Sequence, residues 1–257
     1  MKIISLTLSL ARIFATFGIY MFHVLSQFGV NNHNIDFISI LVFCFLTGFL
    51  SSNVKLDRYQ WLKKRVFSIM LPYWLVIIPV LLANRVVCYK ETTLFEDLVT
   101  FWGGNMFLKN KVYVIAWYIT FILLIYLFTY FQSLYKNLYF KIIVWAIGFC
   151  IFSLWLNKEY YFLSFAIGFL ISTRYPVLPG RKNNKTYLEN KLFSIQSHCY
   201  CFFLIHGGVL VALCYFLHIN IVELFLYGML LSVFGAITLK KAVKLVQRQI
   251  PRFSNVG

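Results

Sequence analysis

Acidic residues are scarce in this chain, which has eight Asp and Glu against twenty-four Lys and Arg among its 257 residues. None of the eight lies deep within an apolar stretch, so the sequence offers no carboxylate pair for glycoside hydrolysis. The same lack argues against a proton-coupled transporter, because such proteins generally bury Asp or Glu in their membrane segments. Charged residues make up only 12% of the chain and hydrophobic residues 61%, with a mean hydropathy of +0.76. This composition excludes an ordinary soluble domain and predicts an integral membrane protein.

Several familiar site motifs are also missing. The sequence has no P-loop and no GxGxxG after a strand, which argues against nucleotide hydrolysis. Its six cysteines include no CxxC pair, and Cys199 and Cys201 would point to different sides of a helix. We therefore expect small buried thiols and no metal site.

Apolar runs of roughly membrane length follow one another with short polar breaks, which predicts an all-α polytopic bundle of about eight transmembrane helices. The runs cover residues 3–27, 37–52, 66–87, 113–132, 141–156, 160–174, 192–215 and 222–239. The first run lacks a small-residue cleavage site, so we expect it to be retained as a span. Because no polar break is long, we expect a single membrane-embedded domain over residues 1–257.

The basic residues predict the orientation of these spans, because cytoplasmic loops are enriched in Lys and Arg. With the N-terminus inside, eighteen of the twenty-four basic residues fall on the cytoplasmic side and five on the other. Both termini are therefore expected in the cytoplasm of a bacterial-type plasma membrane, with the loop from Val86 to Lys111 outside. Orientation accounts for most of the net charge of +16, so we expect no nucleic-acid partner. Part of the charge could still bind anionic lipid headgroups or an anionic ligand, and the segment "KLDRYQWLKKR" (55–65) could form an interfacial helix.

Two polar residues interrupt the first apolar run, "SLARIFATFGIYMFHVL". Arg12 and His23 are eleven residues apart, which places them on one face of a helix at a separation of about 16 Å. Charged groups at membrane depth are costly and usually mark a working site. A histidine there could act as a general base on a hydroxyl group, although it could also simply be held by a neighbouring helix.

This arginine–histidine spacing resembles the first-span signature of the membrane-bound acyltransferase 3 family, and four later segments resemble further family motifs in the same order. "FCFLTGF" is similar to FFFxSGF, "KKRVFSIMLPYW" to the basic stretch before a Pro-Tyr-Trp, "AWYITFILLIYLF" to the WYL element, and "CFFLIHGGVLV" to the YLxH element. One departure lies in the basic stretch, where the family often has two arginines three residues apart. Here Arg65 is followed by Ser68, and Lys63 and Lys64 precede it.

The resemblance implies an O-acetyltransferase that moves an acetyl group from acetyl-CoA to a hydroxyl of a surface or capsular polysaccharide sugar or a lipid-linked sugar. It implies that His23 is the base or a carrier of the acetyl group. It also implies that Arg12 binds part of the donor and that Arg65 with Lys64 binds the CoA phosphates. His206 in the last motif could be structural or part of the site. A transporter or permease for a lipid-linked sugar, or a non-catalytic scaffold, remains an alternative, and the acceptor sugar and the oligomeric state stay open.

Overall fold

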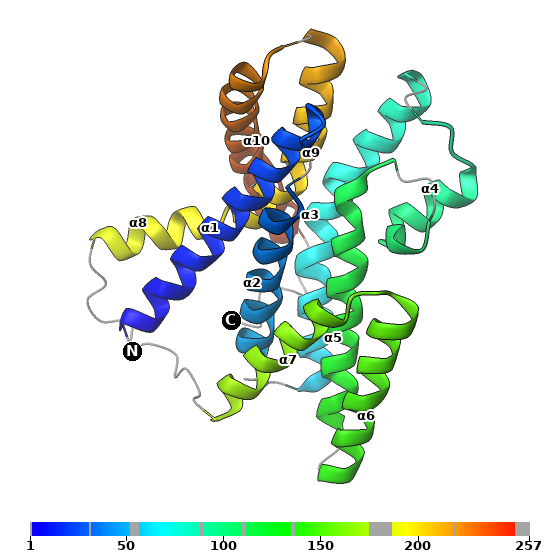
Figure 1. Cartoon of the computed structure of the whole chain (residues 1–257), viewed down its shortest axis with the longest axis vertical. Helices are drawn as coiled ribbons and strands as arrows, with labels where there is room; N and C mark the ends of the chain where they lie inside the picture. Colours follow the sequence, from blue (N-terminus) through cyan, green and yellow to red (C-terminus); the bar gives the residue numbers. More distant parts are fainter. Residues whose placement is uncertain are drawn as a thin grey trace. The chain divides into compact units, whose positions relative to one another are not determined.

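The computed structural model describes residues 2–30, 32–51, 57–87, 90–108, 112–134, 137–174, 187–217 and 219–249, and all regular elements within these ranges are helical (Figure 1). The longer helices are α1 (Lys2–Gln27), α2 (His33–Ser51), α3 (Arg58–Val87), α5 (Trp117–Leu134), α6 (Leu138–Cys150), α7 (Glu159–Arg174), α9 (Cys199–Leu217) and α10 (Ile221–Gln249). The shorter elements are α4 (Leu94–Phe101), α8 (Tyr187–Gln196), the 3₁₀ turns η1 (Asn105–Phe107) and η2 (Val114–Ala116), and the π-helical segment η3 (Ile151–Trp155).

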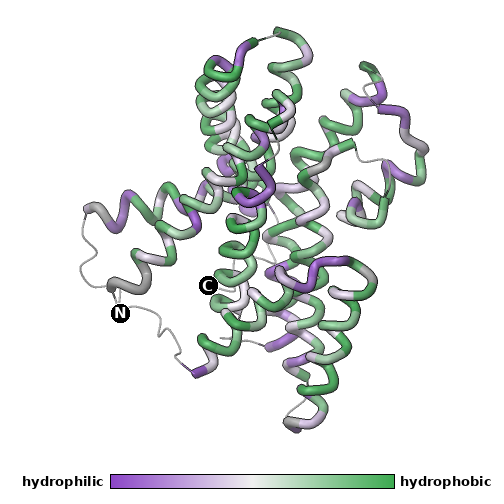
Figure 2. The backbone as a smooth tube through the Cα atoms, in the orientation of Figure 1, coloured by the Kyte–Doolittle hydropathy of each residue, from purple (hydrophilic) through white to green (hydrophobic). Residues whose placement is uncertain are grey.

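Six of the helices in the described ranges are long and apolar enough to cross a membrane: α1, α2, α3, α5, α9 and α10. Their central turns are hydrophobic, and hydrophilic residues gather towards helix ends and connections (Figure 2). The prediction of an all-α polytopic membrane protein is confirmed. The fifth and sixth apolar runs also form helices, α6 and α7, but these are shorter, so the count of eight spans stays a prediction.

The chain clusters into two compact units, each made of discontinuous segments. Unit 1 comprises residues 1–22, 31–65 and 124–197, and unit 2 comprises residues 23–30, 66–123 and 198–257. The division falls within α1, α3 and α5, so each of these helices contributes to both units. The prediction of a single domain is not tested by this division.

In unit 1, α2 packs closely on α7 through a reciprocal pair of glycines. A Cβ atom added at Gly48 would lie 2.9 Å from the backbone nitrogen of Phe169, and nearer still to the Phe165 carbonyl oxygen. A Cβ added at Gly168 would likewise run into the backbone of Phe45. Small residues permit such close approach of two membrane helices. The Ser164 hydroxyl also donates a 2.8 Å hydrogen bond from α7 to a carbonyl of α2.

In unit 2, α9 packs on α10, and a folded connection follows α3. Thr93 begins α4 with a capping box, in which its side chain accepts from the Glu96 backbone and the Glu96 carboxylate accepts from the Thr93 backbone. Arg85, in the last turn of α3, pairs with Asp97 on α4 through a 2.8 Å contact between Nε and Oδ2. The expected loop from Val86 to Lys111 therefore contains a helix tied to the preceding span.

Two expectations about segment boundaries were wrong. The segment 58–65 is no separate interfacial helix, because it forms the first turns of α3 and buries Trp61, which is 6% exposed. The apolar run 192–215 is divided by a turn at residues 197–198, so its first residues belong to α8 and the rest to α9. Residues 175–186, part of the expected basic loop, lie outside the described ranges.

Candidate active site

Helix α1 carries both predicted catalytic residues without a break. It is continuous from Lys2 to Gln27, so the eleven-residue spacing of Arg12 and His23 is a helical spacing, as expected. Both side chains are partly buried. The Thr16 hydroxyl donates a 2.8 Å hydrogen bond to the Arg12 carbonyl, so the polar side chain of Thr16 is satisfied within its own helix.

In unit 1, Arg12 and Arg65 both act on the hydroxyl group of Tyr126. Arg65 shares a hydrogen bond with this buried tyrosine, and the charges of both arginines interact with it. The Arg65 guanidinium carbon also lies 5.9 Å from the Tyr126 ring centroid and 6.0 Å from that of Trp61. The two rings meet edge to face at 5.8 Å. Two of the predicted site residues thus interact with the same tyrosine, Arg65 through a hydrogen bond and Arg12 through its charge. We call Arg12, Trp61, Arg65 and Tyr126 the arginine cluster.

Lys64 differs from its neighbour Arg65. Its side chain is exposed on α3, whereas Arg65 is partly buried beside the two aromatic rings. A guanidinium is planar and stacks on aromatic faces, while a lysine ammonium stays strongly hydrated. The two residues were predicted to act together. In the structure Arg65 belongs to the arginine cluster, whereas Lys64 is exposed.

In unit 2, His23 lies against His206 of α9. Their ring centroids are 5.2 Å apart with an interplanar angle of 49°. His206 is 1% exposed and stacks on Phe202 at 5.7 Å with the rings almost parallel. Phe203 also packs against His206, with ring centroids 5.8 Å apart. The second histidine is thus fixed by the rings of its own helix while it contacts the predicted base.

The proton on His206 is assigned by its hydrogen bond. Nδ1 lies 3.2 Å from the carbonyl oxygen of Phe202, and a carbonyl oxygen can only accept. Nδ1 therefore donates, which leaves Nε2 of the neutral ring as an acceptor nitrogen. Nε2 is buried and makes no hydrogen bond within the described part of the chain, although the His23 ring lies next to the His206 ring at a centroid separation of 5.2 Å.

Other residues of the sequence motifs have packing roles. The Thr47 hydroxyl donates a 2.8 Å hydrogen bond to the Phe43 carbonyl one turn earlier, and Gly48 beside it makes the contact with α7. Tyr118 is buried and meets Phe203 edge to face at 5.4 Å. These motif residues therefore contribute to packing, Gly48 to the contact of α2 with α7 in unit 1 and Tyr118 to the rings around His206 in unit 2.

These observations define a multi-pass helical membrane protein whose first helix carries a clustered arginine and a paired histidine. The family model for an acyltransferase domain of the acyltransferase 3 type matches residues 6–189. The chain belongs to this family, and it is a membrane acyltransferase. No curated protein and no solved structure matches it.

The matched segment holds all four predicted site residues but ends before α9. His206 consequently lies beyond it, and its contact with His23 comes from the fold alone. Sequence reasoning had singled out His206 without a partner and had missed Tyr126 as the partner of the arginines. An aromatic residue within an apolar run carries no local signal of such an interaction, because Tyr126 is 61 positions from Arg65 and 114 positions from Arg12.

Proposed function

We propose that this membrane acyltransferase transfers an acetyl group from acetyl-CoA to a hydroxyl group of a sugar in a surface or capsular polysaccharide. The observation that carries the proposal is the pairing of His23 with His206 in a chain of this family. A neutral imidazole near a hydroxyl group is a suitable general base. The protein would lie in the plasma membrane with both termini in the cytoplasm.

The arginine cluster suits the anionic donor. Two guanidinium groups whose charges both reach the Tyr126 hydroxyl favour an anion beside it. CoA is a cytosolic polyphosphate, and basic residues concentrate on the cytoplasmic side in the predicted orientation. Arg65 would bind phosphate with Lys64 at the surface, and Arg12 would bind an anionic or carbonyl group of the donor.

The reaction needs one proton carrier. His23 takes the proton of the sugar hydroxyl while the oxygen attacks the carbonyl carbon of the thioester. The carbon–sulfur bond then breaks, and the proton moves from His23 to the departing sulfur, which gives the O-acetyl ester and CoA. A covalent route, in which His23 first accepts the acetyl group and then passes it to the sugar, uses the same residue.

His206 would serve this chemistry by orienting His23. Its Nε2 can accept an N–H from His23, which would leave the second nitrogen of His23 free of its proton and directed at the acceptor. A partner that fixes the tautomer of a catalytic histidine is a recurring arrangement in acyl transfer.

The test is transfer by the purified protein in liposomes. Radiolabelled acetyl-CoA and an acceptor saccharide should give labelled saccharide and an equal amount of free CoA thiol, and protein-free liposomes should give neither. Movement of unlabelled saccharide across the liposome membrane, with no ester formed, would instead identify a permease and end the proposal.

A further inference from the structure

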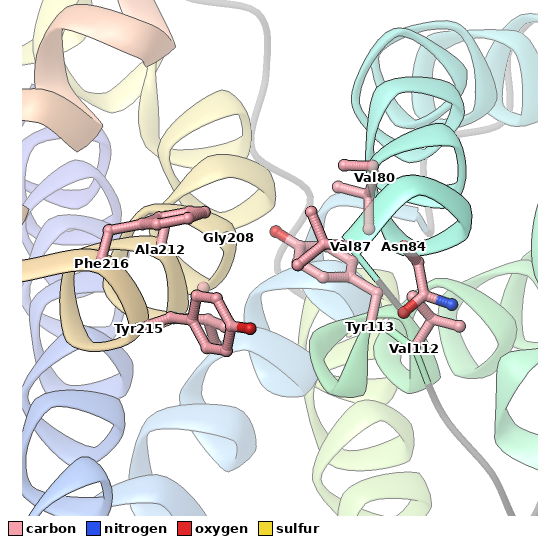
Figure 3. Close-up of a pocket in the computed structure, with 12 residues that line it drawn as sticks. Val80, Asn84, Val87, Val112, Tyr113, Gly208, Ala212, Tyr215 and Phe216 are labelled. Carbon is pink, nitrogen blue, oxygen red and sulfur yellow. The ribbon is translucent and has the colours of Figure 1, made fainter. Parts of the chain in front are cut away.

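Unit 2 contains a cavity of about 170 Å³ between the end of α3, residues 112–113 and the second half of α9 (Figure 3). Its walls are mainly small and apolar, with Val80 and Val87 on α3 facing Gly208, Val211, Ala212 and Phe216 on α9. A cavity of about 150 Å³ with such walls stays dry and accepts a hydrocarbon the size of benzene. The site therefore has the capacity for a short stretch of hydrocarbon chain.

The polar groups at two positions of the cavity wall are already engaged with the protein. The Asn84 amide donates to the Lys90 carbonyl at 2.9 Å and accepts from the Lys90 backbone N–H at 2.9 Å. The Tyr113 hydroxyl donates to the Leu204 carbonyl. These groups fix the walls, and the remaining lining favours an apolar ligand because burying a polar one without partners is costly.

The rim of the cavity is both apolar and exposed. Val87 is 40% exposed, Tyr215 50% and Phe216 65%, and they lie towards the C-terminal ends of two apolar spans. Large apolar side chains exposed at such positions face lipid, with tyrosine near the membrane boundary. A ligand can therefore enter from the bilayer, which favours the chain of a lipid over a water-soluble molecule.

The cavity and the histidine pair lie on opposite faces of α9. At about 100° per residue, Gly208, Ala212 and Tyr215 are turned about 180–240° away from His206. A helix with its side chains is about 10–12 Å across, and Gly207 and Gly208 of the cavity wall directly follow His206, so the cavity lies within about one helix diameter of the histidine pair. The cavity thus suits the part of a substrate that is remote from the reacting group.

We propose that this cavity binds the hydrocarbon tail of a lipid-linked saccharide, which is the form in which the acceptor reaches His23. This proposal rests on the proposed function, since it names the acceptor class of the same reaction. The tail gives affinity without taking part in the chemistry, and the saccharide remains free to place its hydroxyl group at His23.

Two adjacent glycines provide the means to test the cavity. A Cβ added at Gly207 would collide with the Ile115 side chain, so this glycine is needed for packing. A Cβ added at Gly208 would meet only a Tyr113 ring carbon, at 3.8 Å, so a side chain there projects into the cavity. Gly208→Leu and Ala212→Leu fill the cavity from two positions. Ala146→Leu, at an exposed position of α6 in unit 1, is the matched control.

The first experiment measures binding alone. A polyprenyl-phosphate disaccharide with a diazirine in its tail should label the protein in nanodiscs at residues 80–87 and 207–216. Gly208→Leu and Ala212→Leu should each reduce that labelling roughly tenfold, because the new side chain displaces methylene groups of the lipid tail from the cavity. Ala146→Leu should leave the labelling unchanged. Absence of labelling there, or equal labelling by a diazirine phosphatidylcholine that competes with the saccharide lipid, would overturn the proposal.

The second experiment separates this proposal from the proposed function. In the transfer assay, Gly208→Leu should raise the KM for the lipid-linked acceptor roughly tenfold and leave the KM for acetyl-CoA and for a tail-free saccharide unchanged. An unchanged KM for the lipid-linked acceptor would contradict the cavity proposal. Labelling of the cavity without any acetyl transfer would leave the lipid site in place and overturn the proposed function.

Discussion

At the scale of the residue, Arg65 and Lys64 are neighbours in sequence with different surroundings. Arg65 lies beside the rings of Trp61 and Tyr126, whereas Lys64 is exposed. A charge-assisted contact from a partly buried group is worth about 1.5–3 kcal/mol, while an exposed ion pair is worth about 0–1 kcal/mol. If both bind the donor, their contributions should therefore be unequal.

Replacing each cation separately tests this inequality. Arg65→Gln should raise the KM for acetyl-CoA by about tenfold to a hundredfold, and Lys64→Gln by less than about fivefold. Initial rates at varied acetyl-CoA give both values, and the KM for the acceptor should stay the same. Equal effects of the two substitutions, or an effect on the acceptor instead, would contradict the assignment of Arg65 to the donor.

The nitrogens of His206 can be removed while its shape is largely kept. His206→Phe preserves an aromatic ring beside Phe202 but removes the acceptor nitrogen proposed to orient His23, so kcat should fall by about tenfold to a hundredfold, the effect of losing an interaction of about 1–3 kcal/mol during the reaction. His206→Gln keeps an acceptor near the position of Nε2 and should recover part of the loss. If the phenylalanine variant is as active as the unmodified protein and the glutamine variant is not, His206 only fills space.

At the scale of the element, the apolar runs predicted the existence of the main helices correctly. Hydropathy alone did not predict the short helix α4, the turn between α8 and α9 or the burial of Trp61. Helix α4 could have been found from Thr93 and Glu96, whose spacing is that of a capping box. The split between α8 and α9 has no Pro or Gly to mark it, since the turn falls at Ser197 and His198. The burial of Trp61 depends on Tyr126 of another helix, and no local pattern reports such a partner.

The close glycine contact between α2 and α7 predicts that one added methyl group, in Gly48→Ala, lowers the stability of the protein. Gly48→Ala places a Cβ against the backbone of α7, which cannot move as a side chain can, so the helices must separate. Overpacking of this kind costs about 1–3 kcal/mol. The apparent unfolding temperature in detergent should drop, while Gly208→Ala, which meets only a distant ring carbon, should leave it nearly unchanged. Equal stability of the two variants would show that the close approach is not required.

At the scale of the whole molecule, composition alone predicted an all-helical membrane protein, because no soluble fold accommodates so much apolar sequence. The arginine cluster and the histidine pair were only partly predictable. Spacing placed Arg12 and His23 on one helix face, but their partners Tyr126 and His206 come from distant segments. The division into two units that share α1, α3 and α5 leaves no linker in the sequence, so composition could not reveal it.

Orientation in the membrane is the prediction that concerns the whole chain. In a variant without native cysteines, Glu91→Cys should react with an impermeant maleimide in intact cells, and Lys191→Cys should react only after the cells are opened. The reason is the excess of basic residues, eighteen against five, on the side that carries Lys191. The reverse labelling pattern would invert the topology and place His23 near the cytoplasm.

The central claim is that His23 is the base for acyl transfer. The most direct measurement is acetyl transferred to saccharide per unit of folded membrane protein, for the unmodified chain, His23→Ala and His23→Gln. The account predicts that both variants insert normally and that both lose transfer by about 10²- to 10⁴-fold, because glutamine keeps size and hydrogen bonding but cannot take up a proton. Near-normal transfer by His23→Gln, or a loss of transfer that only follows a loss of folded protein, would contradict it.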